Sequence, residues 1–163
     1  MIKYADVSRP EIRNLKSAVM ESHYLPEDIL ENPTAVLVYF LPFIPETAKS
    51  NIAGESASPE WAKAYQETDR LSEALNVRLV EMITGLGYRA AAPADAGSFS
   101  DDILKSRWSH RHIAQAAGLG TFGINRMLIT ENGCCGRYYS VVTDLPVETD
   151  RPSAEEFCSY KKD

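Results

Sequence analysis

The residues with the clearest chemical character lie between Ile103 and Thr130. This stretch contains no Asp or Glu, although the whole chain has 23 acidic residues, 17 basic residues and a formal charge of -6. Guanidinium and ammonium groups segregated in this way predict a site for an anionic or phosphate-bearing ligand. A positively charged surface exposed to solvent is the simpler interpretation. The basic and imidazole side chains of the stretch are Lys105, Arg107, His110, Arg111, His112 and Arg126.

Three glycines, Gly118, Gly120 and Gly123, lie within this basic stretch. Glycine adopts backbone conformations closed to other residues and lets a ligand approach the main chain, so Ala117 to Arg126 is a candidate binding turn. Alternatively, Gly118 ends a helix and the other two glycines make a turn. The spacing matches G-x-G-x-x-G, but a dinucleotide-binding fold has a strand before that motif and a helix after it. The predicted order here is the reverse, which excludes that fold.

The segment from Ile113 to Gly120 also resembles the first helix and turn of a helix-turn-helix DNA-binding module. A second, recognition helix should then follow. Phe122 to Thr130 instead contains Gly123 and ends in the β-favouring run Leu128-Ile129-Thr130. The negative overall charge also disfavours general binding to nucleic acid. DNA binding is therefore the least favoured alternative.

The histidines and cysteines do not show the spacing of a metal site. His110 and His112 are two positions apart, which on a helix points them about 200° from one another. Cys134 and Cys135 are adjacent, and Cys158 makes the count odd, which fits neither a disulfide framework nor a zinc ribbon. We expect reduced thiols and hence a cytoplasmic protein.

Length and hydropathy limit the remaining possibilities. A chain of 163 residues, 44% of them hydrophobic, is long enough for one compact domain with its own core. The most apolar run, Ala35 to Ile44, is interrupted by Pro42 and is far shorter than the roughly 20 residues of a membrane-spanning helix. We therefore expect no membrane span, and the N-terminus does not have the pattern of a signal peptide.

Hydrophobic spacing predicts the elements that position the basic stretch. From Pro59, apolar residues recur at three- and four-residue steps, which predicts one long amphipathic helix ending at Gly85 or Gly87. Ala35 to Leu41 predicts a central strand, and Trp108 to Ala117 a shorter helix. Because helices and strands do not alternate regularly, the predicted fold class is α+β. The other predicted elements are a helix from Ser8 to about Met20, a loop from Pro42 to Pro59, a strand at Tyr88 to Ala92, and strands at Ile124 to Thr130 and Tyr138 to Asp144 joined through a turn at Asn132-Gly133.

An ordered set of residues in the last third of the chain resembles the epoxyqueuosine reductase family and its iron-sulfur relatives. Weaker similarity extends back through the predicted strand and the long helix. The matching residues are Ile113-Ala114, Ala117-Gly118-Leu119-Gly120, Phe122-Gly123, Asn125, Leu128-Ile129, Gly133, Ser140-Val141, Thr143-Asp144-Leu145-Pro146, Asp150 and Pro152.

The resemblance implies a domain with a nitroreductase-like mixed sheet flanked by helices, and this domain binds cobalamin. In the family it is followed by a ferredoxin-like part with two four-iron clusters. Electrons would pass from the clusters through cobalamin to a modified tRNA base. It implies a cobalamin-binding α+β domain at residues 1–147, and a linker at 148–163 toward an iron-sulfur domain missing from this chain. The run C-x-x-C-x-x-C-x-x-x-C-P that holds a cluster is absent, so we expect no complete activity from this chain alone.

The resemblance also assigns residues to the site. The family's acidic proton donor falls in register with Leu104, which leaves Asp101, Asp102 and His110 as candidate catalytic residues. Cys158 is a possible iron-sulfur ligand, but only in a longer chain. Two further family positions, a tryptophan and a lysine, are Thr121 and Ile124 here, which suggests a divergent substrate. The cofactor-binding residues implied are Arg111, Gly118, Leu119, Gly120, Gly123, Asn125 and Arg126.

One alternative keeps the fold and changes the cofactor. Nitroreductase relatives bind flavin mononucleotide (FMN), and the basic stretch suits its phosphate. Since such enzymes generally complete their sites across a dimer, this alternative predicts a homodimer. The cobalamin interpretation predicts tRNA as a possible partner.

Overall fold

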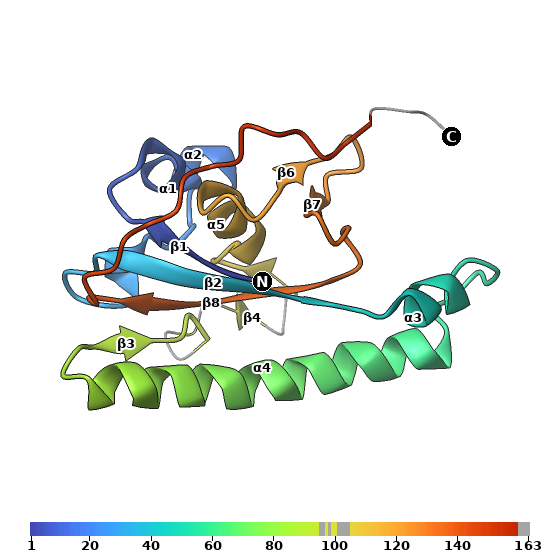
Figure 1. The fold of residues 1–163 in the computed structure, drawn as a ribbon, viewed down its shortest axis with the longest axis horizontal. Coiled ribbons are helices and arrows are strands. Elements are labelled where there is room, and N and C mark those ends of the chain that lie inside the picture. Colours follow the sequence, from blue (N-terminus) through green and yellow to red (C-terminus); the bar gives the residue numbers. More distant parts are fainter. Residues whose placement is uncertain (95–96, 98, 101–104, 160–163) are drawn as a thin grey trace.

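The computed structural model describes residues 1–94, 97, 99–100 and 105–159. Its central feature is an antiparallel sheet of four strands in the order β1-β2-β8-β3 (Figure 1). The strands are β1 (Ile2–Asp6), β2 (Ala35–Pro42), β8 (Gly136–Thr143) and β3 (Ala90–Ala91). Helices and a sheet combined in one domain confirm the α+β prediction. The expectation of a mixed sheet was wrong, because all described pairings of this sheet are antiparallel. Among the described residues, no helix is both long and apolar enough to cross a membrane.

The central strand β2 is buried on both faces, as its continuous run of apolar residues requires. Val36, Val38 and Phe40 point to one face, and Leu37 and Tyr39 to the other. Helices cover both faces (Figure 1). The long helix α4 (Pro59–Gly85) lies on one face, and α1 (Pro10–Arg13), α2 (Leu15–Ala18) and α5 (His110–Ala116) lie on the other.

The long helix begins and ends as predicted. Ser58 caps its N-terminus, because the side-chain oxygen accepts a hydrogen bond from the Trp61 backbone N–H at 3.1 Å. At the other end, Gly87 has φ +87°, the left-handed conformation that ends a helix. Leu75 and Leu79 pack against Tyr39 and Tyr139 of the sheet.

Three predictions of local structure were wrong. The first helix is interrupted at Asn14, and Ser8 bonds to Asp6 instead of capping it. The predicted loop after Pro42 contains a short helix, α3 (Pro45–Ser50). The predicted strand pair is also wrong. β7 (Leu128–Ile129) pairs with β6 (Thr121–Phe122), whereas β8 pairs with β2 and β3. A second small pair joins β4 (Phe99–Ser100) to β5 (Lys105–Ser106).

The order of elements after α5 also argues against the DNA-binding alternative. In the described part of the chain, α5 is followed by β6 and not by a second helix. Gly118 ends α5 with φ +76°, and the β-favouring residues that follow form the β6–β7 pair. A recognition helix therefore has no place at this position.

The C-terminal segment packs on the domain through its last described residues. The Asp150 carboxylate accepts a hydrogen bond from the Tyr4 backbone N–H at 2.9 Å, and the Asp150 N–H donates to the Tyr4 carbonyl at 2.8 Å. Further on, the Phe157 N–H donates to the Thr121 hydroxyl at 3.0 Å. Residues 150–157 thus extend from the free edge of β1 to β6, and their role as a linker stays a prediction.

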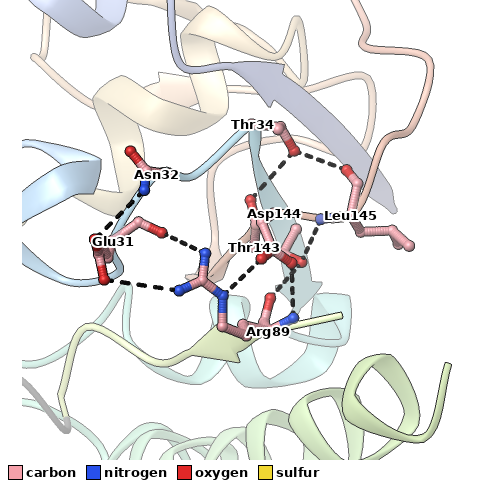
Figure 2. A network of polar contacts seen from close by, with 7 residues as sticks. All are labelled: Glu31, Asn32, Thr34, Arg89, Thr143, Asp144 and Leu145. Atoms are coloured by element: carbon pink, nitrogen blue, oxygen red, sulfur yellow. Dashed lines mark hydrogen bonds and ion pairs between the residues drawn. The ribbon is translucent and has the colours of Figure 1, made fainter. Parts of the chain in front are cut away.

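Arg89 joins β3 to the end of β8 (Figure 2). Its Nε and its backbone N–H each donate to the Asp144 carboxylate at 2.7 Å, and its Nη2 donates to the Glu31 carbonyl at 2.9 Å. The hydrogen bonds from Arg89 lower the pKa of Asp144. The bond from the Arg89 backbone N–H has the largest effect, and the bond from its side chain comes next. Thr143 adds a hydrogen bond from its hydroxyl to the Arg89 carbonyl.

We expect Arg89→Ala to loosen this end of the sheet. The backbone N–H of Asp144 donates to the Arg89 carbonyl, so its exchange with solvent deuterium should become faster. Arg78→Ala is the matched control, since within the described chain Arg78 pairs with Glu81 alone, on the exposed surface of α4. If both variants exchange this amide at the wild-type rate, the Arg89 network does not hold β3.

Candidate functional site

A cleft follows the edge of β8 where that strand has no neighbour on one side. β3 pairs only with Val142 and Thr143, so in the described residues the edge from Gly136 to Val141 is open. Side chains from both faces of β8 therefore meet at this edge, between α4 and α5. Pro93 follows β3 closely, and proline cannot continue a hydrogen-bonded ladder.

The cleft has two adjoining lobes, which we call the α5 lobe and the α4 lobe. Their volumes are about 550 Å³ and about 610 Å³. The two lobes share Tyr65, Ser106, Trp108, His110, Arg137 and Tyr138. The α5 lobe also reaches Ser109, Arg111 and Met127, and the α4 lobe also reaches Asp69, Glu73, Asn76 and Tyr139.

His110 is held in one tautomer by a buried network. The Ser140 side-chain oxygen lies 2.9 Å from both Trp108 Nε1 and His110 Nδ1. An indole N–H can only donate, so the serine oxygen accepts from Trp108. Ser140 is fully buried, and the only other described partner for its hydroxyl proton is His110 Nδ1. The neutral ring of His110 therefore carries its proton on Nε2.

The charge state of His110 follows from its surroundings. Desolvation, with a smaller contribution from the Arg137 guanidinium, lowers the pKa of His110 to about 4. At neutral pH the ring is uncharged. It therefore offers the cleft an N–H hydrogen-bond donor at Nε2 and is not a protonated acid.

Arg137 is fixed by contacts with α4 on the opposite side of the cleft. Its Nη2 donates to Asp69 at 2.9 Å, and its guanidinium carbon lies 3.9 Å from the centre of the Tyr65 ring. The Tyr139 hydroxyl donates to the same Asp69 oxygen at 2.7 Å. The second terminal guanidinium nitrogen, Arg137 Nη1, is buried and has no hydrogen-bond partner among the described residues.

A second histidine supports the start of α5. His23 is buried, stacks on Trp108, and accepts a hydrogen bond from the Ser109 backbone N–H at its Nε2. Its Nδ1 then donates to the Tyr24 carbonyl. Burial lowers the pKa of His23 and keeps it in this neutral form. His23 thus positions Trp108 and, through Ser109, the first turn of α5.

Two of the residues predicted for the site line the cleft. His110 and Arg111 face the α5 lobe, where Arg111 Nη1 also donates to the Arg126 carbonyl at 3.1 Å. Asn125 and Arg126 are exposed in the turn between β6 and β7, and Leu119 is buried in the core. Among the described residues, neither lobe is lined by the glycines or by these three residues. Asp101, Asp102 and Leu104 lie outside the described residues.

The glycines of the basic stretch lie against the chain itself. A Cβ added to Gly118 would be 2.1 Å from the Arg151 carbonyl oxygen, and one added to Gly120 would be 2.2 Å from that of Ile129. At Gly123 it would meet the Ile129 and Asn125 side chains and, at 3.4 Å, Cys158 Sγ. Packing accounts for these glycines, and contact with a cofactor stays a prediction.

The three cysteines are free and partly buried. Burial raises the pKa of the Cys134 thiol, which keeps it protonated. In the part of the chain that the structure describes, no three His, Cys, Asp or Glu side chains are placed to hold a metal ion. A role for Cys158 as an iron-sulfur ligand stays a prediction for a longer chain.

The sequence analysis missed Asp69, Arg137 and Tyr139. Arg137 and Asp69 are 68 positions apart, and their contact depends on how α4 crosses the sheet. The one local signal is the alternation in β8, where Arg137 and Tyr139 share the face turned toward α4. A charged residue at the start of an otherwise apolar strand indicates a partner but does not identify it.

Comparisons with known proteins identify the fold. No protein-family model matches the sequence, and no curated protein sequence does. Among solved structures, epoxyqueuosine reductase from Bacillus subtilis, with its catalytic aspartate loop swung out of the active site, matches with a TM-score of 0.63 and 18% identity. The match covers 99% of this chain and 45% of that one.

Two further structures agree. Epoxyqueuosine reductase bound to an epoxyqueuosine-modified tRNA-Tyr stem loop matches with a TM-score of 0.63 and 17% identity, over 99% of this chain and 45% of that chain. The enzyme from Streptococcus thermophilus matches with a TM-score of 0.57 and 14% identity, over 96% and 45%. This chain spans less than half the length of these proteins, and over that span it has the fold of an epoxyqueuosine reductase.

Proposed function

We propose that this chain is the cofactor-binding domain of an epoxyqueuosine reductase-like oxidoreductase, and that the cleft beside β8 holds the cofactor and the reacting part of the substrate. The observation that carries the proposal is this cleft, with aromatic rings, an imidazole N–H and two arginines, in a chain whose fold matches an epoxyqueuosine reductase over 99% of its length. Large pockets with a few convergent polar groups are the usual ligand sites of enzymes.

The cleft residues fit cobalamin in chemical type. A corrin is broad and flat, carries amide groups around its edge and brings its own metal ion, so it needs flat faces and hydrogen-bonding groups and no ligand set from the protein. The exposed ring of Tyr65 supplies a flat face, and Ser106, His110 and Asn76 supply hydrogen-bonding groups. When bound, the cobalamin would supply electrons to the substrate from cobalt.

His110 acts in this proposal as a positioning residue. Its Nε2–H donates to the bound molecule, and Ser140 together with Trp108 holds the ring in that orientation. At neutral pH it does not serve as the proton donor, because its pKa is about 4. Asp101 and Asp102 remain proposed for that role.

We propose that electrons come from an iron-sulfur part outside these residues. The chain contains three cysteines, whereas a four-iron cluster usually takes four. The proposed macromolecular partner is tRNA, which is supported by the similar reductase bound to a modified tRNA stem loop. The nitroreductase-like relation and a cytoplasmic location also remain proposals.

Titration with cob(II)alamin tests the proposal. We expect a saturable change in the cobalamin absorbance, and weaker binding by Tyr65→Ala, since loss of one stacking aromatic costs about 1 kcal/mol, or about fivefold in affinity. Tyr88→Ala is the matched control, because Tyr88 is also an exposed tyrosine but does not line either lobe. A folded protein that binds neither cob(II)alamin nor FMN would contradict the proposal.

One observation favours FMN as the second candidate cofactor. The α5 lobe is lined by Arg111 and Arg137 and by no described carboxylate, which suits a phosphate group. The same titration with FMN, together with sedimentation of the purified protein, separates the two candidates. The flavin alternative requires tighter binding of FMN than of cobalamin and a homodimer.

A further inference from the structure

One nitrogen of the Arg137 guanidinium lacks a hydrogen-bond acceptor in this structure. Arg137 Nη1 is the one buried side-chain nitrogen or oxygen without a hydrogen bond in the described part of the chain. Arg137 Nη2 donates to Asp69 and the guanidinium carbon lies over the Tyr65 ring, so the side chain is held where it is. A buried donor without an acceptor is unfavourable, and more so on a charged group. An acceptor that enters the cleft would remove this cost.

The charges around the cleft determine which kind of acceptor it is. The described side chains of the α5 lobe include Arg111 and Arg137 and no carboxylate, whereas the α4 lobe includes Asp69 and Glu73. Arg111 donates to the Arg126 carbonyl and to the Met127 sulfur, and no described carboxylate pairs with it. The α5 lobe is therefore lined by more positive charge than the α4 lobe, with Arg111 unpaired by any described carboxylate and Arg137 paired with Asp69 through Nη2.

We infer that the α5 lobe is a subsite for an oxyanion, either a phosphate or a carboxylate. In this subsite Arg137 and Arg111 provide charged donors, and the neutral His110 provides a third donor at Nε2. Arginine favours such groups because its planar guanidinium matches their geometry. The inference rests on the proposed function in one respect, which is that the cleft is where the ligand binds.

Two sources could bring the oxyanion, and both present the same chemistry to the arginines. It belongs either to the cofactor, as the phosphodiester of cobalamin or the phosphate of FMN, or to the substrate. Cobinamide lacks the nucleotide phosphodiester of cobalamin, and riboflavin lacks the phosphate of FMN. A cofactor source predicts that each phosphate-free compound binds more weakly than its partner. Equal affinities within each pair place the oxyanion on the substrate.

The inference is tested first with inorganic phosphate, at constant ionic strength maintained with chloride. We expect saturable binding by calorimetry, together with shifts of the Arg137 and Arg111 Nε–H signals in NMR spectra. Arg137→Gln and Arg111→Gln should each weaken binding by about tenfold or more, the usual effect of removing a charge-assisted hydrogen bond. Arg78→Gln on the exposed surface of α4 is the control and should bind as the wild type does.

Arg111→Gln keeps the test valid if Arg137→Gln does not fold, since Arg111 has no ion pair among the described residues to lose. Arg137→Lys adds a second check, because it keeps the charge but loses the planar donors and should fall between the wild type and Arg137→Gln. Unchanged phosphate affinity in Arg111→Gln and Arg137→Lys overturns the inference, even if cob(II)alamin binds. Phosphate binding that depends on both arginines, without binding of cob(II)alamin or FMN, overturns the proposed function instead.

Discussion

Gly118→Ala is expected to lower the free energy of unfolding by about 2–5 kcal/mol, because it combines two separate costs. Gly118 has φ +76°, where an L-residue is strained by about 1–2 kcal/mol. Its new Cβ would also lie 2.1 Å from the Arg151 carbonyl oxygen, and relieving such overpacking typically costs about 1–3 kcal/mol. Since the obstacle is backbone, a rotamer change cannot relieve it.

Three other glycines separate these costs. Gly120→Ala has the close contact without a positive φ, and we expect a loss of about 1–3 kcal/mol. Gly133→Ala has φ +81° and no atom within 4 Å of the new Cβ, so only the strain applies. Gly85→Ala has neither, and as a helical position it should be neutral or stabilise by up to about 1 kcal/mol.

Urea unfolding of the four variants measures the series. The binding interpretation of the glycine turn makes a different prediction, because a cradle for a ligand should lose affinity on substitution while the protein without ligand stays stable. If Gly118→Ala and Gly120→Ala unfold at the same urea concentration as Gly85→Ala, the close contacts with Arg151 and Ile129 are not present in solution.

The end of α5 shows what local sequence can predict. The Gly118 N–H donates to the Gln115 carbonyl and the Leu119 N–H to that of Ala114, which is a Schellman motif with a buried apolar residue after the glycine. These interactions lie within six consecutive residues, so the local pattern of residue types predicts them. Local sequence also predicts β2 and α4. The apolar residues of β2 form a short continuous run, as in a buried strand, and those of α4 recur at three- and four-residue steps, as in a helix.

The cleft depends on contacts between distant residues, which is why the sequence analysis predicted only part of it. His110 was predicted as a candidate catalytic residue and Arg111 as a cofactor-binding residue, both within the basic stretch that contains the glycine turn. Arg137 and Tyr139 meet Asp69 only because α4 crosses the sheet beside the open edge of β8. That edge is open because β3 spans two residues, and the sequence predicted a longer strand there.

The wrong strand pair has a similar cause. Asn132-Gly133 does make a turn, in which Gly133 has φ +81° and Thr130 bridges to Gly133. The chain then continues through Cys134 and Cys135, and the Cys135 carbonyl accepts a hydrogen bond from the Phe43 N–H. After this point β8 begins and pairs with β2. A turn signal predicts that the chain reverses direction locally, but it does not predict which strands pair. Here β8 pairs along its full length with β2 and not with β7.

Acid is expected to destabilise the protein between about pH 6.5 and pH 4 through its histidines. Burial is the first cause that lowers the pKa of all three, His23, His110 and His112. The unfolded chain has histidine pKa values near 6.5, so in this window it binds more protons than the folded protein does. Stability is therefore fully present above about pH 6.5 and is lost as the pH falls through the folded pKa values.

His110 has the pKa of about 4, and its share of the loss is at most about 3 kcal/mol. The structural reason is specific, because a protonated Nδ1 cannot accept the Ser140 hydroxyl proton, and a protonated His23 cannot accept the Ser109 N–H. Asp6 and Asp144, whose pKa values are lowered by hydrogen bonds, lose their contribution only at lower pH.

Urea unfolding at pH 7.5, 6.5, 5.5 and 4.5 measures the loss, and NMR titration of the three imidazole signals assigns it. His110→Gln should flatten the curve between pH 6.5 and 4.5, because its side chain does not titrate there. His112→Gln is the comparison variant: it removes a partly buried histidine outside the cleft, so it should lessen the loss by its own share and leave the His110 titration in place. An unfolding free energy that is constant from pH 7.5 to 4.5 would contradict the burial of these rings, and with it the tautomer assigned to His110.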